Sequence, residues 1–136
     1  MKEHKLFIVG TPIGNFDDIT FRALDTLKKV DIIACEDTRV TLKLLNHFDI
    51  KNKKLISYHN FNEKNSAKGI IDLILNKNLS VALVSDAGMP TISDPGFNLI
   101  EEARKQKINF VVIPGVSATT TAICASNLGP EFTFLG

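Results

Sequence analysis

The stretch Leu6-Phe-Ile-Val9, followed at once by Gly10-Thr-Pro-Ile-Gly14, decides the fold class. Four apolar residues in a row, without polar alternation, are typical of a parallel strand that is covered on both faces. Similar runs of strand length recur at Ile32-Ile-Ala-Cys35, Leu55-Ile-Ser-Tyr58, Val81-Ala-Leu-Val84 and Phe110-Val-Val-Ile113. Between them, apolar residues follow helical spacing, as in Phe21, Leu24 and Leu27, in Leu42, Leu45 and Phe48, in Ile70, Ile71, Ile74 and Leu75, and in Leu99, Ile100 and Ala103. The sequence therefore predicts an α/β fold, with an open, mostly parallel five-stranded sheet and helices on both faces.

The expected helix starts agree with this alternation. Thr20 precedes the first helical segment and Ser117 precedes the last, and each has a hydroxyl that can accept a hydrogen bond from the first turn. Asp94 followed by Pro95 predicts a third start, with proline at the first helical position.

The composition is that of an ordinary globular domain. The chain has 136 residues, 44% of them apolar, and 16 Lys and Arg against 15 Asp and Glu leave a net charge of +1. This balance excludes a disordered tail or a basic arm, and the length fits one domain with one core. Because no apolar run is long enough for a membrane span or a secretion signal, we expect a cytoplasmic protein without membrane contact. Cys35 and Cys124 lie in apolar stretches without metal-ligand spacing, which predicts buried, reduced thiols and no metal site.

The last residues depart from the regular alternation. Glu131-Phe-Thr-Phe-Leu-Gly136 has the pattern of a new strand and then stops. We therefore expect residues 1–130 to form the main domain and residues 131–136 to begin a second one, in a chain that is a truncated form.

Glycine and proline gather after three of the predicted strands, in Gly10 to Asn15, Ser85 to Gly96 and Pro114 to Ala118. In a parallel sheet, ligands bind beyond the carboxyl ends of the strands, where such residues allow tight turns and close backbone approach. Each turn alone is more often a simple connector, but the twelve residues of the middle segment are many for a strand-to-helix connection. Together the three loops predict a cleft for a small molecule.

Ionisable residues follow the second and third strands. Glu36-Asp37-Thr38-Arg39 is costly to bury unless paired, so either Arg39 neutralises a carboxylate or the group faces a polar substrate. His59 is a candidate general base because imidazole titrates near neutral pH, although a histidine at a strand end is more often structural. Asp86 and Asp94 are candidates for the same cleft, with helix capping or turn formation as the alternative.

Several longer stretches carry a family resemblance. They are Leu6-Phe-Ile-Val-Gly-Thr-Pro-Ile-Gly-Asn15, Asp17-Asp-Ile-Thr-Phe-Arg-Ala-Leu24, Cys35-Glu-Asp-Thr-Arg39, Ser57-Tyr-His59 with Asn62-Glu63, Val84-Ser-Asp-Ala-Gly88 with Pro90, Ile92-Ser-Asp-Pro-Gly96, and Ile113-Pro-Gly115 with Ser117-Ala118. In this order they closely resemble the ribosomal RNA small subunit methyltransferase I family, within the tetrapyrrole methylase superfamily. The resemblance covers essentially the whole chain but only the first half of the family members, which continue into a second α/β domain.

The resemblance implies S-adenosylmethionine-dependent 2′-O-methylation of a cytidine ribose in 16S ribosomal RNA of the small subunit, by an enzyme that is a homodimer when full length. In the superfamily the methyl donor lies in the cleft between the two domains. Together with the glycine-rich loops, the resemblance implies donor contacts from Pro12, Ile13, Gly14, Gly88, Met89, Pro90, Ile92, Gly115, Ser117 and Ala118. The candidates for catalysis are Glu36, Asp37, Arg39, His59 and Asp86, which the sequence does not rank.

Met89 and Val116 stand where the family usually has threonine and proline. Two alternatives to a ribosomal RNA methyltransferase remain open at this point. One is a tetrapyrrole- or diphthine-type methyltransferase of the same superfamily, and the other is an inactive, truncated domain that binds no donor.

The basic stretch Lys51-Asn-Lys-Lys54, with Lys43 and Lys64, is either a solvated loop or part of an RNA groove.

Overall fold

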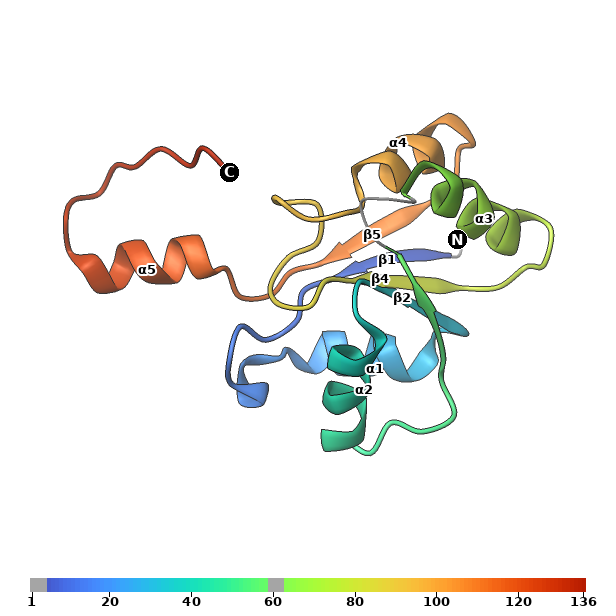
Figure 1. The fold of residues 1–136 in the computed structure, drawn as a ribbon, viewed down its shortest axis with the longest axis horizontal. Coiled ribbons are helices and arrows are strands. Elements are labelled where there is room, and N and C mark those ends of the chain that lie inside the picture. Colours follow the sequence, from blue (N-terminus) through green and yellow to red (C-terminus); the bar gives the residue numbers. More distant parts are fainter. Residues whose placement is uncertain (1–4, 59–62) are drawn as a thin grey trace.

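A parallel sheet forms the centre of the molecule, as the apolar runs predicted (Figure 1). The computed structural model describes residues 5–58 and 63–136. Over these residues five strands lie in the order β3-β2-β4-β1-β5, and each pair of neighbours is parallel. The strands are β1 (Leu6–Val9), β2 (Ile32–Cys35), β3 (Lys54–Ser57), β4 (Val81–Val84) and β5 (Phe110–Ile113). The helices of the described residues are α1 (Phe21–Lys29), α2 (Thr38–His47), α3 (Glu63–Leu75), α4 (Phe97–Lys105) and α5 (Ala118–Ser126), with a short 3₁₀ helix, η1, at Phe16–Asp18.

Helices cover both faces of this sheet. α1 and α2 pack on one face, and α3 and α4 pack on the other (Figure 1). Strand side chains alternate between the two cores, so that Leu6 and Ile8 of β1 join the core under α3 and α4 whereas Val9 joins the core under α1 and α2. The long apolar runs of the sequence thus reflect central strands that are shielded from water on both sides.

The two edge strands are less covered than the sequence predicted. The central strands β2 and β4 are buried at every residue, but β3 is exposed at Lys54 and Ser57, and β5 is exposed at Val112. β3 also ends at Ser57, one residue before the predicted end at Tyr58. The strand order gives the reason, because an edge strand has a neighbour on one side only and lies at the margin of the covering helices.

Two of the three predicted helix starts are confirmed. The Thr20 hydroxyl accepts a hydrogen bond of 3.0 Å from the backbone N–H three residues later, at the start of α1. The Ser117 hydroxyl accepts the equivalent hydrogen bond, at 3.4 Å, at the start of α5. Both side chains satisfy a backbone donor that the helix itself leaves without a partner.

The third predicted helix start, at Asp94 and Pro95, is wrong. α4 begins at Phe97, with Gly96 as its N-cap and no capping hydrogen bond from a side chain. Gly96 has a φ of +135°, and a Cβ at this position would lie 2.8 Å from the Leu83 side chain. The turn therefore requires glycine, and the helix begins only after it.

Polar contacts join loops at the amino ends of the strands. The Asp31 carboxylate accepts hydrogen bonds from the backbone N–H of Ser80 at 2.8 Å and from its hydroxyl at 3.0 Å, and these bonds lower the pKa of Asp31. The Lys53 ammonium donates to the carbonyls of Lys28 and Val30, at 2.5 and 2.6 Å, where α1 ends. Lys53 therefore helps to hold the end of α1 in place.

α5 and the residues after it project from the body of the molecule (Figure 1). No residue of α5 is buried, so the prediction of a buried thiol is wrong for Cys124 and confirmed for Cys35 in β2. Residues 131–136 form no strand, so the prediction of a strand in this segment is wrong. They run beside α5 and return toward the loop that follows β4, residues 85–96, which we call the β4 loop. A Cβ at Gly136 would lie 3.3 Å from Ser93 Oγ in this loop. A strand needs a hydrogen-bonded neighbour, and none of the described strands lies beside this segment.

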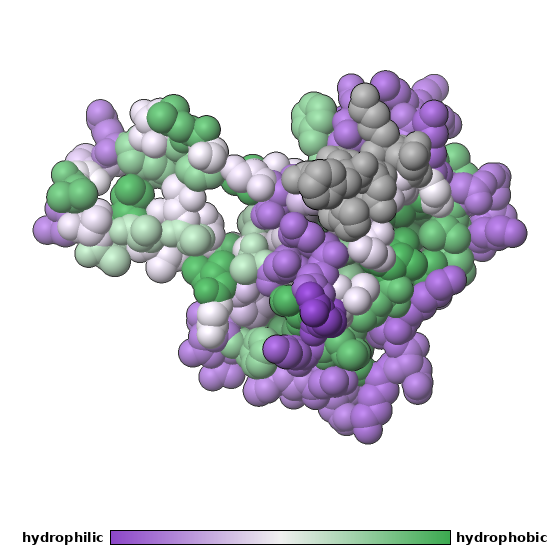
Figure 2. All heavy atoms as spheres, in the orientation of Figure 1, coloured by the Kyte–Doolittle hydropathy of each residue, from purple (hydrophilic) through white to green (hydrophobic). Residues whose placement is uncertain are grey.

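The projecting part has a less polar surface than the body. Figure 2 shows hydrophilic side chains over most of the rim of the body, whereas weakly polar and hydrophobic residues prevail on the projection. The large apolar side chains exposed there are Leu128, Phe132, Phe134 and Leu135. Leu128 and Leu135 are almost fully exposed and Phe132 and Phe134 are half exposed, which gives the projection an apolar surface.

Candidate functional site

The loops after β1 and β4 meet at the carboxyl ends of the strands. Thr11 and Gly88 exchange two backbone hydrogen bonds of 3.0 Å, and the buried Thr11 hydroxyl donates to the Ser85 carbonyl at 3.2 Å. β1 and β4 are neighbours, and the helices that follow them lie on opposite faces of the sheet (Figure 1). Open α/β sheets bind ligands at such a switch point.

A close backbone approach joins the loop after β1, residues 10–15 (the β1 loop), to the loop after β5, residues 114–117 (the β5 loop). The Gly10 N–H donates to the Ile113 carbonyl at 3.1 Å, and a Cβ at Gly10 would lie 2.7 Å from Met89 Sδ and 2.9 Å from Gly115 Cα. A Cβ at Gly115 would lie 3.1 Å from Gly10 Cα. Gly115, an expected donor contact, is thus packed against Gly10, where it sets the distance between the two loops.

One hollow, of about 340 Å³, lies between the β4 loop and the start of α5, and we call it the α5 hollow. It is lined by Ile13, Ala87, Gly88, Met89, Ile92, Asp94, Ser117, Ala118, Thr119 and Phe134. The fold therefore brings together six of the expected donor contacts: Ile13, Gly88, Met89, Ile92, Ser117 and Ala118. Pro90 is buried and is not among the lining residues.

A second hollow, of about 300 Å³, lies between the β1 loop, α2 and the β4 loop, and we call it the α2 hollow. It is lined by Thr11, Pro12, Ile13, Gly14, Phe16, Val40, Thr41, Leu44, Ser85, Asp86 and Ala87. Pro12, Gly14 and Asp86 were expected at the site, whereas Phe16, Val40 and Leu44 were not. The signal for them lies in the sequence, since Phe16 directly follows the β1 loop and Val40 and Leu44 are four residues apart on one face of a helix.

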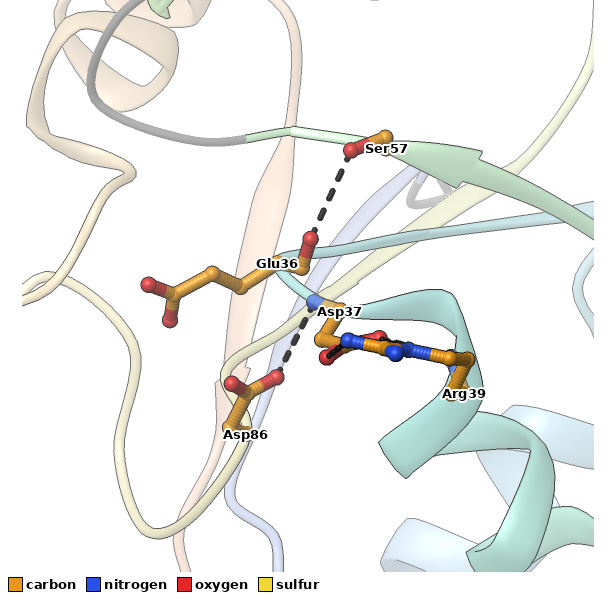
Figure 3. Close-up of polar contacts among 5 residues, drawn as sticks. All are labelled: Glu36, Asp37, Arg39, Ser57 and Asp86. Carbon is orange, nitrogen blue, oxygen red and sulfur yellow. Dashed lines mark hydrogen bonds and ion pairs between the residues drawn. The ribbon is translucent and has the colours of Figure 1, made fainter.

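The charged stretch after β2 is organised around the start of α2 (Figure 3). The Asp37 carboxylate accepts hydrogen bonds from the Arg39 backbone N–H at 2.9 Å and from the Arg39 guanidinium at 2.9 and 3.1 Å. The backbone N–H of Asp37 donates to Asp86 Oδ1 at 3.0 Å. The Glu36 side chain points away from the Arg39 guanidinium, and the Glu36 carbonyl accepts a 3.4 Å hydrogen bond from the Ser57 hydroxyl. Of the pairings that the sequence left open, the structure shows Arg39 with Asp37.

The two perturbed carboxyl groups of the site shift in opposite directions. Hydrogen bonds from Arg39 hold the pKa of Asp37 below its usual range. Burial raises the pKa of Asp94, and the negative charge of Asp86 raises it further. A carboxylate with a raised pKa is the stronger proton acceptor near neutral pH, so Asp94 suits general-base work better than Asp37. The sequence left two roles open for Asp94, helix capping and a place in the cleft, and the structure places Asp94 in the lining of the α5 hollow.

Three further expectations concern absences or residues outside the structure. His59 lies outside the described residues. Among residues 5–58 and 63–136, no group of three or more His, Cys, Asp or Glu is arranged to hold a metal ion. In the same part of the chain, no helix is both long and apolar enough to cross a membrane.

Comparison with known proteins identifies the family. The family model of the Tetrapyrrole (Corrin/Porphyrin) Methylases matches residues 5–135. The chain belongs to this family. Two relatives named ribosomal RNA small subunit methyltransferase I are that of Mycoplasmopsis pulmonis, 60% identical over 132 residues, and that of Thermotoga maritima, 53% identical over 135 residues. These matches cover 97% of this chain but 59% of each relative, so the chain spans somewhat more than half their length.

Solved structures share the fold at much lower identity. Diphthine synthase superposes with a TM-score of 0.74 at 18% identity, covering 91% of this chain and 49% of that one. Uroporphyrin-III-C-methyltransferase from Thermus thermophilus superposes with a TM-score of 0.70 at 22% identity, covering 96% and 55%. Another structure of a uroporphyrin III C-methyl transferase from that organism, with a TM-score of 0.63 and 17% identity, is complexed with S-adenosyl homocysteine and covers 92% and 49%. Together these structures confirm the α/β fold predicted from the sequence.

Proposed function

We propose that this chain forms the donor-binding part of an enzyme that uses S-adenosylmethionine to methylate the 2′-oxygen of a cytidine in 16S ribosomal RNA. One observation carries the proposal: the two relatives at 60% and 53% identity are named for methylation of small-subunit ribosomal RNA. The structures named for tetrapyrrole or diphthine chemistry share only 17–22% identity, which makes those substrates the weaker alternative. Small ribosomal subunits are the partner that this proposal implies.

The residues of the α5 hollow fit S-adenosylmethionine. Ile13, Met89 and Ile92 provide apolar surface for the adenosine, and a hollow of about 340 Å³ lies within the usual range of small-molecule pockets. The first turn of α5, which Ser117 caps, presents backbone N–H groups that suit the carboxylate of the donor. Gly88, with a φ of +78°, lets the β4 loop approach closely.

When bound, S-adenosylmethionine supplies an electrophilic methyl group. The protein must then hold the ribose hydroxyl in line with this methyl group and take up the proton that the hydroxyl loses. We assign to Asp94 the role of general base that accepts the hydroxyl proton, because Asp94 lines the α5 hollow and its raised pKa favours proton uptake. Asp37 has a positioning role instead, since it binds Arg39 through its carboxylate and Asp86 through its N–H.

The donor site can be tested on this chain by calorimetric titration with S-adenosylhomocysteine. Ile92 is 57% exposed and lines the α5 hollow, so Ile92→Ala should weaken binding several-fold without unfolding the protein. Leu75 is 51% exposed at the end of α3, outside both hollows, and Leu75→Ala is the matched control. Equal affinities of wild type and Ile92→Ala, or no binding to any of the three proteins, would contradict the donor site.

The substrate can be tested with small ribosomal subunits whose 16S RNA lacks the modification. After incubation with methyl-labelled S-adenosylmethionine, the label is expected in 2′-O-methylcytidine, as identified by nucleoside mass spectrometry. Label in another nucleoside would contradict the proposed reaction. Failure of the chain both to bind S-adenosylhomocysteine and to label the RNA would favour the inactive domain without donor binding that the sequence left as an alternative.

A further inference from the structure

We propose that the α2 hollow holds the base of the acceptor nucleotide, with Phe16 as its stacking surface and Asp86 as the acceptor of an amine on the base. A cytosine fits this description. The inference rests on the proposed function, to which it adds the residues that recognise the base.

The position of the α2 hollow suits an acceptor site. The α2 and α5 hollows share two lining residues, Ile13 and Ala87, so they lie next to each other. A base held in the α2 hollow would place its ribose near these two residues, next to the residues proposed for the donor. Methyl transfer requires such close approach of the two reactants.

Phe16 is held in place at the edge of the α2 hollow. Its ring centroid lies 4.5 Å from that of His47, with 41° between the rings, and 6.4 Å from that of Phe48, with 68° between the rings. These contacts restrict the ring, yet 37% of Phe16 stays exposed. With Val40 and Leu44 on α2, it lines the hollow with apolar surface. Proteins that recognise single, unstacked bases use aromatic side chains in this way.

Asp86 makes the α2 hollow selective for a base that carries an amine. Its Oδ1 accepts the N–H of Asp37, and no hydrogen bond from the described part of the chain reaches Oδ2 (Figure 3). A carboxylate can only accept, so it binds the N4 amine of cytosine and repels the O4 carbonyl of uracil. A hollow of about 300 Å³ is at the small end of ligand pockets, which favours one ring over the two rings of adenine.

The test uses the ¹⁵N-labelled chain and measures amide shifts during titration with cytidine, uridine and adenosine 5′-monophosphates. Cytidine monophosphate should shift amides of residues 11–16 and 40–44, and should bind about tenfold more tightly than uridine monophosphate. Phe16→Ala should weaken this binding about tenfold. Phe21→Ala is the matched control, because Phe21 is 93% exposed at the start of α1 and outside the hollow. Tighter binding of adenosine monophosphate, or shifts confined to other residues, would overturn the inference.

Asp86→Asn gives a readout that does not depend on stability. The asparagine Oδ1 can still accept from the Asp37 N–H, while its amide NH₂ now faces the ligand as a donor. The ratio of cytidine to uridine monophosphate affinity should therefore fall about tenfold or reverse. An unchanged ratio would overturn the role of Asp86 even if both nucleotides bind.

A parallel titration with S-adenosylhomocysteine separates the two proposals. It should shift amides near Ile92 and residues 117–119, whatever happens in the α2 hollow. Shifts there without any response to cytidine monophosphate would overturn the inference and leave the proposed function standing. Asp86-dependent cytidine binding without S-adenosylhomocysteine binding would support the base site and contradict the donor site.

Discussion

Gly10→Ala tests whether the contact between the β1 and β5 loops sets the geometry of the site. The new Cβ would lie 2.7 Å from Met89 Sδ and 2.9 Å from Gly115 Cα, about 1 Å inside the optimum for nonbonded carbon contacts. Met89 can turn away, but the Gly115 backbone cannot without moving the loop. Overpacking of this kind costs about 2 kcal/mol, which corresponds to a fall in Tm of about 6 °C for a domain of this size.

The assay is urea unfolding followed by far-ultraviolet circular dichroism, since the chain has no tryptophan. The matched control is Gly69→Ala in α3, where a Cβ would meet nothing within 4 Å and the position is exposed. This second substitution should raise the free energy of unfolding by about 0.5–1 kcal/mol, because alanine loses less backbone entropy in a helix.

A functional consequence follows from the same contact. Because Met89 lines the α5 hollow, its displacement by Gly10→Ala should also weaken S-adenosylhomocysteine binding, whereas Gly69→Ala should leave it unchanged. If Gly10→Ala has the same urea midpoint as wild type and binds S-adenosylhomocysteine with the same affinity, the reasoning about this backbone contact is wrong.

Three further predictions concern charged side chains. Lys53→Met should cost about 1–2 kcal/mol of unfolding free energy because it removes two hydrogen bonds to carbonyls at the end of α1. The control Lys51→Met breaks an exposed 3.1 Å ion pair and should cost under about 0.5 kcal/mol in the same urea assay. Asp31→Asn should be less stable than wild type at pH 7. Because the pKa of Asp31 is lowered in the folded protein, the stabilisation from its carboxylate is lost as the carboxylate protonates, so the urea midpoints of variant and wild type should converge below about pH 4. The wild type should become more stable as pH falls from neutral toward 4, because the raised pKa of Asp94 means that the fold favours its protonated form. Asp94→Asn should lack this gain in stability. A wild-type urea midpoint that stays flat over this range would contradict the raised pKa.

The helices and strands that follow from the local order of apolar and capping residues could be predicted with few errors. Apolar runs identified the strands because a central parallel strand is shielded on both faces, and a short hydroxyl side chain before a helical segment identified the starts of α1 and α5. The start of α4 was missed because it depends on Gly96, whose φ of +135° is a backbone conformation that other residues rarely adopt. Cys124 was misplaced because burial depends on what packs against a helix, and no described element covers α5.

The sequence by itself determined the fold class, the family and the three loops that carry most of the residues lining the two hollows. Each of these depends on neighbouring residues or on motifs that can be read in order. Tertiary structure alone decided how those residues divide between two hollows, that the Asp37 N–H donates to Asp86, and that Gly115 packs against Gly10. It also brought Phe16 to the same hollow as Asp86, 70 positions later in the chain. The physical reason is that parallel pairing of β1 with β4 aligns the ends of strands that are distant in sequence, and no local pattern records which loops then meet.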